Sequence, residues 1–551
     1  MSGDNLVSVF LQRVSERGDH GALLIKQQEQ FVSITWNQLF SDVSAAASVL
    51  DQLDVGPGNR VALVSENRYE WIVCDLAIQM IGAVHVPIHS TLSAEQVVWQ
   101  IEHSESKVVL LSGPDQASKL AQQVDTKFAK ISILCFDSSD IQINGHKIQS
   151  LHSMMSSTVV ADLDSWEQVA RTIRSDDLAT ILYTSGTTGE PKGVMLTHGN
   201  LVSNARSTVE SFPTEADVCQ LSFLPFSHVF ARTCDIYTWL ERGTVIALAE
   251  RRETVLADCA QVRPSMITGV PYFYDRVYRH LVESGVADKP GVLRDLFGGK
   301  IRYCVSGGAA LPTHVFEFFH SQDVPLLEGY GMTECSPVIA LSTPEFYKSG
   351  CVGRPLTGVE VKIAVDGEIV TRGPHVMRGY WKDEPGTEEI LRDGWLHTGD
   401  IGCWNDSGFL QITGRKKELI ITSGGKNIAP VLIESLLTQD PLILQAMVIG
   451  DGRKYLSVLI VPNPDRLRDE IISRQLVVSN RAEALAHPTV VSLYDQRIKE
   501  RLAGLSDYEQ VQKFCLLDRG FTLETGELTP KLSLRRKVIE SHFKLEIDTM
   551  Y

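Results

Sequence analysis

The segment 183–193, YTSGTTGEPKG, places glycines, hydroxyl side chains and one lysine directly after the apolar run Ala179 to Tyr183. Glycine lets backbone N–H groups approach a phosphate closely, and hydroxyls and a lysine supply further donors. This composition predicts a loop that follows a strand and holds a polyphosphate; a surface turn rich in Ser, Thr and Gly is the alternative. The predicted phosphate-binding residues are Thr184, Ser185, Gly186, Thr187, Thr188, Gly189 and Lys192.

The loop differs from a Walker A loop at two positions. Gly186 and Lys192 have the required separation, but Pro191 stands where that motif needs a glycine, and Gly193 where it needs Ser or Thr. The Ser or Thr of a Walker A loop binds magnesium. A magnesium ion at this loop must therefore be held by a residue from another part of the chain.

The same segment resembles the signature of the AMP-forming acyl-adenylate enzymes, the ANL superfamily of acyl-CoA synthetases, luciferases and peptide-synthetase adenylation domains. Six further segments resemble motifs of this family, in the family's order and over nearly the whole chain. They are LPFSHVFART from Leu224, VSGGAALP from Val305, EGYGMTECSP from Glu328, LHTGDIG from Leu396, GRKKELIITSGGKNIAP from Gly414 and GELTPKLSLRRKVI from Gly526.

The resemblance implies a nucleotide site. It places Tyr330 against one face of adenine, with backbone atoms against the other face, because flat apolar surfaces desolvate a base well. Thr333 is expected at the α-phosphate of ATP. The residues that the resemblance assigns to this site are Gly308, Ala309, Tyr330, Gly331, Met332 and Thr333.

Two acidic residues receive roles in the same site. Glu334 offers the hard oxygen that magnesium prefers and, with Thr184, is expected to hold an Mg²⁺ ion that bridges the phosphates. Asp400 is expected to accept hydrogen bonds from both ribose hydroxyls, and Arg415 is assigned to the same ribose. For Asp400 the alternative is an aspartate that only stabilises a turn after Gly399.

The segments SHVFART and GVPYFYDRVY resemble synthetases that act on long-chain fatty acids more than luciferases or acetate-activating enzymes. His228 resembles the residue that lies beside the substrate carboxylate in the family, and a packed histidine is the alternative. The aromatics of YFYDRVY fit either a substrate tunnel or helix packing. Gly424 and Gly425 fit either the pantetheine arm of coenzyme A or a plain turn.

The family places a lysine of its terminal domain at the substrate carboxylate and the α-phosphate, where its charge offsets repulsion between two anions. Long-chain synthetases carry it in a pattern like T-P-x-L-K, but Ser533 stands at that position here. Lys531 fits the register of other relatives and is predicted to be this lysine. Arg535, or a solvated basic start of a helix with no catalytic role, are the alternatives.

The surrounding sequence indicates an α/β protein that positions these residues. Short apolar runs alternate with helical patterns over the first two thirds, as in RVALVSEN, RYEWIVCDLAIQMIGA and AVHVPI, which predicts parallel sheets covered by helices. Shorter strands after about residue 350 predict a β-rich subdomain. We expect an N-terminal AMP- and acyl-binding domain over 1–414 and a smaller, mobile α+β domain over 415–551, with Lys417 as the hinge.

Composition excludes several classes of function. The chain has 551 residues and a net charge of −16, which argues against nucleic acid as a partner. Neither a signal peptide nor a membrane span is expected at the amino end, because charged residues interrupt its apolar run. The ten cysteines include no C-x-x-C pair. This indicates a reducing cytoplasm, and a peripheral contact with a membrane is compatible with it.

Taken with the resemblance, these features predict a long-chain fatty acid:CoA ligase that uses ATP, Mg²⁺ and coenzyme A. A fatty acyl-AMP ligase that passes its product to a carrier protein is one alternative. A nucleotide-binding regulator without turnover is another.

Overall fold

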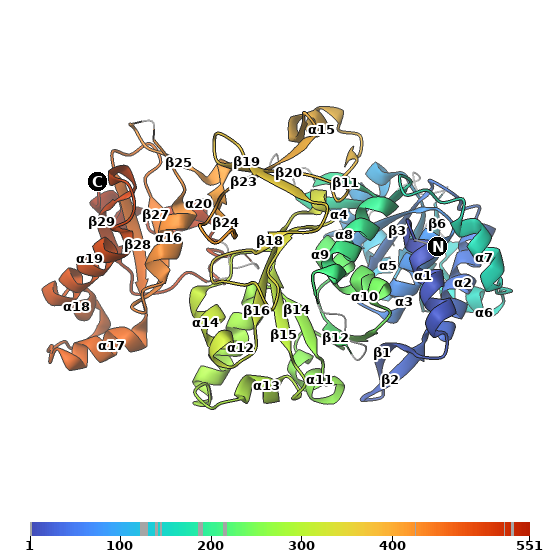
Figure 1. Cartoon of the computed structure of the whole chain (residues 1–551), viewed down its shortest axis with the longest axis horizontal. Coiled ribbons are helices and arrows are strands. Elements are labelled where there is room, and N and C mark those ends of the chain that lie inside the picture. Colours follow the sequence, from blue (N-terminus) through green and yellow to red (C-terminus); the bar gives the residue numbers. More distant parts are fainter. Residues whose placement is uncertain are drawn as a thin grey trace.

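The computed structural model of the chain describes residues 3–121, 131–137, 142–143, 146–185, 191–212, 218–424, 426–522, 524–529 and 534–551. Within these ranges two large sheets form the body of the protein. The last part of the chain, orange to red in Figure 1, forms a separate lobe beside that body.

The first large sheet has nine described strands, of which the central six run parallel and the pairs at both ends run antiparallel. The carboxyl ends of parallel strands are the usual place for a ligand in an open α/β sheet. In order along the sheet the strands are β18 (Arg354–Pro355), β17 (Val338–Leu341), β16 (Leu326–Gly331), β15 (Tyr303–Gly307), β14 (Met266–Gly269), β12 (Cys219–Ser222), β13 (Val245–Leu248), β1 (Gly21–Gln27) and β2 (Gln30–Thr35).

The second large sheet has eight described strands. They are β21 (Gly379–Tyr380), β11 (Pro191–Thr197), β10 (Leu178–Ser185), β4 (Val84–His89), β3 (Arg60–Ser65), β5 (Ser106–Leu111), β6 (Ser132–Cys135) and β9 (Gln149–Ser150). Strand β10 runs parallel to β4 but antiparallel to β11. The glycine-rich segment therefore joins two antiparallel strands, unlike a Walker A loop, which leads into a helix.

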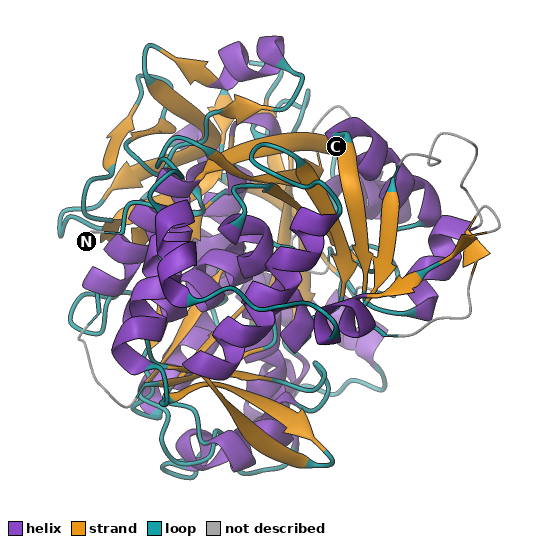
Figure 2. Cartoon of the chain, turned by 90° about the vertical axis from the view of Figure 1, so that its right-hand side faces the viewer, coloured by secondary structure: helices purple, strands orange, loops and turns teal. Residues whose placement is uncertain are grey.

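Helices cover the sheets of the body, as Figure 2 shows in purple. Several begin at a residue that the sequence makes a good N-cap: capping boxes form between Thr35 and Gln38 and between Ser93 and Gln96. The helices are α1 (Leu6–Arg17), α2 (Trp36–Gln52), α3 (Tyr69–Met80), α4 (Ala94–Ser104), α5 (Pro114–Ala121), α6 (Leu151–Ser156), α7 (Leu163–Ala170), α8 (His198–Glu210), α9 (Val229–Ala231), the π-helix η2 (Arg232–Tyr237), α10 (Thr238–Arg242), α11 (Val255–Val262), α12 (Pro271–Glu283), α13 (Val292–Leu296), α14 (Thr313–Ser321), the 3₁₀ helix η3 (Thr333–Cys335) and α15 (Glu384–Ile390).

A smaller sheet follows the two large ones, at the place where the sequence predicts a β-rich subdomain. Its described strands are β19 (Glu360–Ile363), β20 (Glu368–Arg372), β23 (Trp395–Trp404), β22 (Leu391–Arg392) and β24 (Leu410–Arg415). Two short two-stranded sheets are also described before the terminal lobe. They pair β7 (Gln142–Ile143) with β8 (His146–Lys147), and β25 (Ile420–Ile421) with β26 (Asn427–Ile428).

The terminal lobe is built on a sheet of three described strands, β27 (Ile443–Ile449), β28 (Leu456–Pro462) and β29 (Val511–Leu516). Its strands have their own apolar core, with Ile433, Val458 and Leu502 among its buried members. The short helix η4 (Lys416–Glu418) precedes this sheet. The described helices of the lobe are α16 (Pro430–Thr438), α17 (Pro464–Ser473), α18 (Arg481–Ala486), α19 (Pro488–Leu502), η5 (Asp507–Glu509), α20 (Arg536–His542) and α21 (Lys544–Thr549).

The predicted α/β class with helix-covered, largely parallel sheets and a β-rich insertion is confirmed. The prediction was incomplete at the amino end and beside the glycine-rich loop, where β1–β2 and β10–β11 are antiparallel hairpins. Strand β11 begins PKG, a sequence that favours a turn. No helix within the described ranges is both long and apolar enough to span a membrane.

Arg232, from the motif SHVFART, is fully buried in the interior of the body. Its Nη2 lies 2.5 Å from Asp75 Oδ1, and its Nη1 donates to Thr180 Oγ1 at 2.7 Å. His85 Nδ1 lies 2.7 Å from the same Asp75 oxygen. Burial disfavours the ionised carboxyl, but Arg232 and His85 outweigh it and hold the pKa of Asp75 well below its usual range. The network ties α3 and η2 to β10, the strand that leads into the glycine-rich loop.

Arg232→Met is expected to lower the free energy of unfolding by about 3 to 5 kcal/mol, because it leaves the buried charge of Asp75 without its cation. Arg174→Met removes a guanidinium from an exposed pair with Asp176 and should cause no measurable change. The denaturant midpoint of each variant is measured and compared with that of the wild type. Equal midpoints for the two variants would contradict the proposal that the Arg232–Asp75 pair stabilises the fold.

Candidate active site

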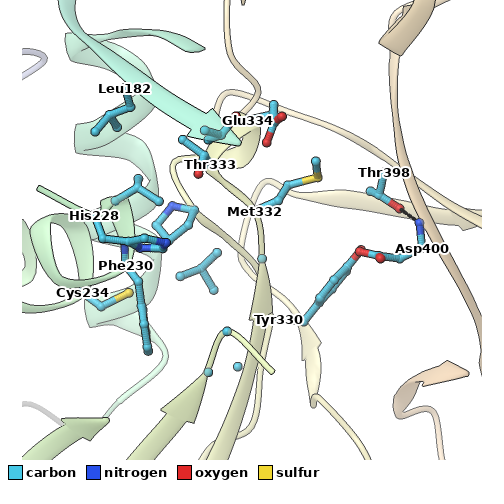
Figure 3. Close-up of a pocket in the computed structure, with 18 of the residues that line it drawn as sticks. Leu182, His228, Phe230, Cys234, Tyr330, Met332, Thr333, Glu334, Thr398 and Asp400 are labelled. Atoms are coloured by element: carbon cyan, nitrogen blue, oxygen red, sulfur yellow. Dashed lines mark hydrogen bonds between the residues drawn. The ribbon is translucent and has the colours of Figure 1, made fainter. Parts of the chain in front are cut away.

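A cavity of about 1050 Å³ lies where the two large sheets, the smaller sheet and the start of the terminal lobe meet. Its walls come from the ends of β10 and β11, from the segments at the ends of β15 and β16, and from β23, β24 and η4. Figure 3 shows the nucleotide-motif residues and the SHVF segment facing this space from different elements. Motifs far apart in the sequence therefore share one cavity.

One wall carries a buried tyrosine and a buried aspartate, the residues that the motifs predict at adenine and ribose. Tyr330 Oη donates to Asp400 Oδ2 at 2.8 Å, and Arg415 Nε lies 2.9 Å from the other oxygen of Asp400. Asp400 and Arg415 are direct cross-strand neighbours on β23 and β24, which explains their contact. Burial raises the pKa of Asp400 above its usual value, while Arg415 and Tyr330 work against that rise.

Glu334 lies in the short helix η3 directly after the tyrosine-bearing strand, and its side chain is buried. Tyr380 Oη donates to Glu334 Oε1 at 2.8 Å. Burial raises the pKa of Glu334, because its one tyrosine hydrogen bond does not replace full hydration of the carboxylate. An Mg²⁺ ion would supply the missing counter-charge, so the environment of Glu334 fits a metal ligand.

In the described part of the chain, no cluster of three or more His, Cys, Asp or Glu side chains is arranged to hold a metal ion. Magnesium in nucleotide sites is commonly bound by one or two carboxylates together with substrate phosphates. Glu334 and Thr184 line the same cavity and meet that requirement.

Lys192 extends from β11 directly opposite Thr184 in the hairpin register. Its Nζ lies 3.0 Å from Asp383 Oδ2 and 4.7 Å from the centre of the Tyr380 ring. The lysine therefore points toward the tyrosine that also binds Glu334. This geometry brings a cation and a carboxylate from separate motifs to the same end of the cavity.

Two glycines of the motifs are required by backbone geometry. Gly308 has a φ of +83°, in the left-handed region that favours glycine, and a Cβ there would meet nothing within 4 Å. A Cβ on Gly331 would lie 2.0 Å from the carbonyl oxygen of Pro337. At both glycines the backbone itself forms part of the cavity wall, because no side chain covers it.

His228 lies at the start of α9, where its Nδ1 accepts a hydrogen bond from the backbone N–H of Phe230 at 3.2 Å. Its ring lies 6.5 Å from that of His89, centre to centre, and both line the cavity. The capping contact fixes the imidazole on the cavity wall, and Figure 3 shows His228 next to Phe230, on the other side of the pocket from Tyr330 and Asp400.

The structure brings most of the residues predicted from the motifs to this cavity. Ala309 and Gly424 are described but do not line it. Gly186, Thr187, Thr188, Gly189, Gly425 and Lys531 lie outside the described residues, as does the side chain of Ser185. The predicted residues that line the cavity are Thr184, Lys192, Gly308, Tyr330, Gly331, Met332, Thr333, Glu334, Asp400, Arg415, Lys417 and His228.

The motifs gave no sign of a buried glutamate that binds the part of β23 just before Asp400. Glu368 Oε1 accepts from Gly399 N at 2.9 Å, and its Oε2 lies 3.0 Å from both His397 Nδ1 and Lys416 Nζ. Burial opposes ionisation of Glu368, but these partners hold its pKa below the usual value. His397 stands inside the motif LHTGD, so the sequence alone could have marked it as a candidate site residue. Glu368 lies 29 residues earlier, and no motif around it indicates a role in the site.

Residues 10–381 match the family described as AMP-binding enzyme, and residues 417–551 match the AMP-binding enzyme C-terminal domain. The chain is 33% identical to Long-chain-fatty-acid–CoA ligase FadD15 of Mycobacterium tuberculosis, over 100% of this chain and 97% of that protein. It is 30% identical to Long-chain-fatty-acid–CoA ligase 5 of Mus musculus, over 89% of this chain and 80% of that protein.

Two solved structures share the fold. Apo MatB from Rhodopseudomonas palustris has a TM-score of 0.75 at 23% identity and covers 98% of this chain and 99% of its own. The Mycobacterium tuberculosis fatty acyl CoA synthetase has a TM-score of 0.68 at 23% identity, with the same two coverages.

Proposed function

Because the chain belongs to the family of AMP-binding enzymes, we propose that it is an ATP-dependent long-chain fatty acid:CoA ligase. The observation that carries the proposal is one cavity that joins the Tyr330–Asp400 pair, the carboxylate of Glu334 and an apolar arm beginning at His228. The first two groups suit a nucleotide with its phosphates, and the third suits the tail of a fatty acid.

The first half-reaction activates the carboxylate. A carboxylate oxygen of the acid attacks the α-phosphorus of ATP, the bond from that phosphorus to the bridging oxygen of the β-phosphate breaks, and pyrophosphate leaves. Tyr330 would stack on adenine, and Asp400 would accept hydrogen bonds from the ribose hydroxyls. Thr333 and Lys192 would donate to phosphate oxygens. These contacts fix the α-phosphate beside the incoming carboxylate, which lowers the entropic cost of the step.

Glu334 and Thr184 would hold an Mg²⁺ ion with the phosphates. When bound, the ion neutralises negative charge on the phosphate oxygens. The hydrogen bond from Tyr380 to Glu334 Oε1 would hold this carboxylate in place for that role.

The second half-reaction exchanges AMP for coenzyme A. The thiol of coenzyme A, as thiolate, attacks the acyl carbon, the mixed anhydride breaks, and AMP leaves with the electron pair. We assign the large domain to 1–414 and the mobile domain to 415–551. Lys417 lies in η4 on the wall of the cavity, where a change of backbone angles would exchange the terminal-lobe residues that face the acyl-AMP.

The acyl arm leads away from His228 between α9 and the ends of β15 and β17. Phe230, Val305, Val338 and Leu341 line it. Each buried methylene of a fatty acid contributes about 0.8 kcal/mol. These apolar side chains therefore suit the methylenes of a long acid near His228.

We place the enzyme in a reducing compartment such as the cytoplasm. All ten cysteines lie in the described part of the chain as free thiols, which is the state such a compartment maintains. Contact with a membrane surface at its periphery would give it access to poorly soluble acids.

Pyrophosphate release over a panel of acids, each with and without coenzyme A, tests the proposed function. We expect release with long acids and sustained turnover only with coenzyme A. Sustained turnover only with a carrier protein would identify an acyl-AMP ligase instead. ATP binding without any release would identify a nucleotide-binding regulator.

Within that panel, hexadecanoate is expected to exceed acetate in kcat/KM by several orders of magnitude, because the longer chain adds many buried methylenes. Steady-state rates at subsaturating acid give the ratio. A preference for acetate or an aromatic acid would contradict the long-chain assignment.

Lys417→Pro is expected to slow thioester formation much more than acyl-AMP formation, because proline fixes φ near −65° and removes a backbone donor at the hinge. Rapid-quench measurement of the two half-reactions separates these effects, with Lys417→Ala as the control for loss of the side chain. Equal loss of both half-reactions in the proline variant would indicate damage to folding rather than to rotation.

A further inference from the structure

The far part of the cavity becomes more polar with distance from His228. The helical run formed by α9, η2 and α10 places a residue on the cavity wall at every fourth position: Phe230, Cys234, Thr238 and Arg242. Residues four apart lie on one face of a helix, so these side chains form a continuous stripe. Figure 3 shows its first members, Phe230 and Cys234, beside His228. The stripe runs from an aromatic ring through a thiol and a hydroxyl to a guanidinium.

Arg242, at the end of this stripe, contacts only neutral groups within the described ranges. Its Nη1 lies 3.6 Å from Met266 Sδ, and its guanidinium carbon lies 5.7 Å from the centre of the Phe212 ring. It also hydrogen-bonds Tyr303. None of the described carboxylates forms an ion pair with it. By contrast, the preceding residue, Glu241, pairs with Arg206 at 3.1 Å.

Two neighbouring hydroxyls keep lone pairs that can accept hydrogen bonds. Thr238 Oγ1 donates to the carbonyl of Cys234 at 2.6 Å, so its lone pairs are not used by that bond. Thr268, which also lines the wall, accepts from Gln220 Nε2 at 3.2 Å and donates to Asp235, so a lone pair of its oxygen is left. The far end thus presents two hydroxyl oxygens that can accept hydrogen bonds and a guanidinium whose described partners carry no charge.

The terminal methyl of a plain fatty acid fits this end poorly, since it would displace water from a cation without supplying an acceptor. A terminal oxygen function fits it well, because a guanidinium binds a carboxylate through two parallel hydrogen bonds. We propose that the far end of the acyl arm binds a polar terminus, and that the preferred substrates are long-chain acids oxidised at the end opposite the reacting carboxylate. This inference rests on the proposed function and specifies its substrate class.

The test compares kcat/KM for pyrophosphate release with hexadecanoic acid, 16-hydroxyhexadecanoic acid and hexadecanedioic acid. The wild type is expected to favour the diacid over the plain acid by about tenfold or more, with the hydroxy acid between them, because hydrogen bonds to charged groups are stronger than neutral ones. Arg242→Met should abolish or reverse the preference. Arg251→Met, which removes an exposed arginine outside the cavity wall, should retain it.

A wild-type preference for hexadecanoic acid, or an unchanged ratio in Arg242→Met, would overturn the inference while leaving the ligase assignment standing. Absence of release with all three acids would overturn the proposed function itself. If Arg242→Met does not fold, as judged by its thermal unfolding, Arg242→Gln keeps donors without the charge. Retention of the full diacid preference in that variant would also contradict the proposal, and its loss would support it.

Discussion

Glu334→Gln is expected to lower the rate of acyl-AMP formation by two orders of magnitude or more, on the order of 3 kcal/mol of lost stabilisation. The substitution removes the charge that would hold Mg²⁺ but almost no volume. The amide also keeps an oxygen that can accept the hydrogen bond from Tyr380. Thermal unfolding should therefore remain close to that of the wild type. ATP–pyrophosphate exchange with hexadecanoate measures the effect.

Two controls make this result specific. Glu388→Gln is the same chemical change at an exposed residue outside the cavity wall and should retain the wild-type exchange rate. Calorimetry of ATP binding, with and without Mg²⁺, gives a readout apart from turnover. The metal should tighten binding to the wild type and have little effect on binding to Glu334→Gln. Wild-type exchange in Glu334→Gln would overturn the metal assignment.

Lys531→Ala is expected to slow the adenylation half-reaction by a similar factor, on the order of 3 kcal/mol of lost charge stabilisation. Two anions, the fatty acid carboxylate and the α-phosphate, must approach each other in this step, and a lysine between them offsets their repulsion. Thioester formation from supplied acyl-AMP should stay nearly normal, because that step attacks an uncharged acyl carbon. Single-turnover measurement of both half-reactions makes the distinction.

Arg535→Ala is the matched control, since Arg535 is the other candidate for the catalytic cation. Arg535 Nη1 donates to the carbonyl of Gly526 at 3.1 Å, a contact that favours a local structural role. Its neighbour Arg536 lies 2.7 Å from the buried Glu434, so at least this member of the basic segment anchors α20. A wild-type rate for Lys531→Ala with a slow Arg535→Ala would move the catalytic assignment to Arg535.

Local sequence identified the site residues themselves, because each stands in a short recognisable motif. Tyr330 and Glu334 stand in one short segment, and Asp400 and Arg415 each stand in a recognisable motif. What joined these residues was not visible in the sequence: Tyr380 binds Glu334 from 46 positions away, and Asp400 meets Tyr330 across 70 positions. Such contacts depend on how the sheets pack against one another, and no pattern of periodicity records that.

The fold was predictable where hydrophobic runs were long and regular, as in β3, α3 and β4. It was missed where a strand begins with residues typical of a turn, as β11 does at Pro191. Pairing to β10 on one side and β21 on the other overrides the weak local preference of this segment. The buried contacts of Arg232 were equally hidden, because its motif gives the residue type but not its partner Asp75.

The most direct test of the proposed chemistry follows the carboxylate oxygen. Hexadecanoate labelled with oxygen-18 in both carboxylate oxygens is incubated with the enzyme, ATP, Mg²⁺ and coenzyme A, and the products are analysed by mass spectrometry. Attack on the α-phosphorus predicts one labelled oxygen in each AMP and one in each acyl-CoA. Unlabelled AMP, or label in inorganic phosphate with ADP as the nucleotide product, would contradict activation through acyl-AMP.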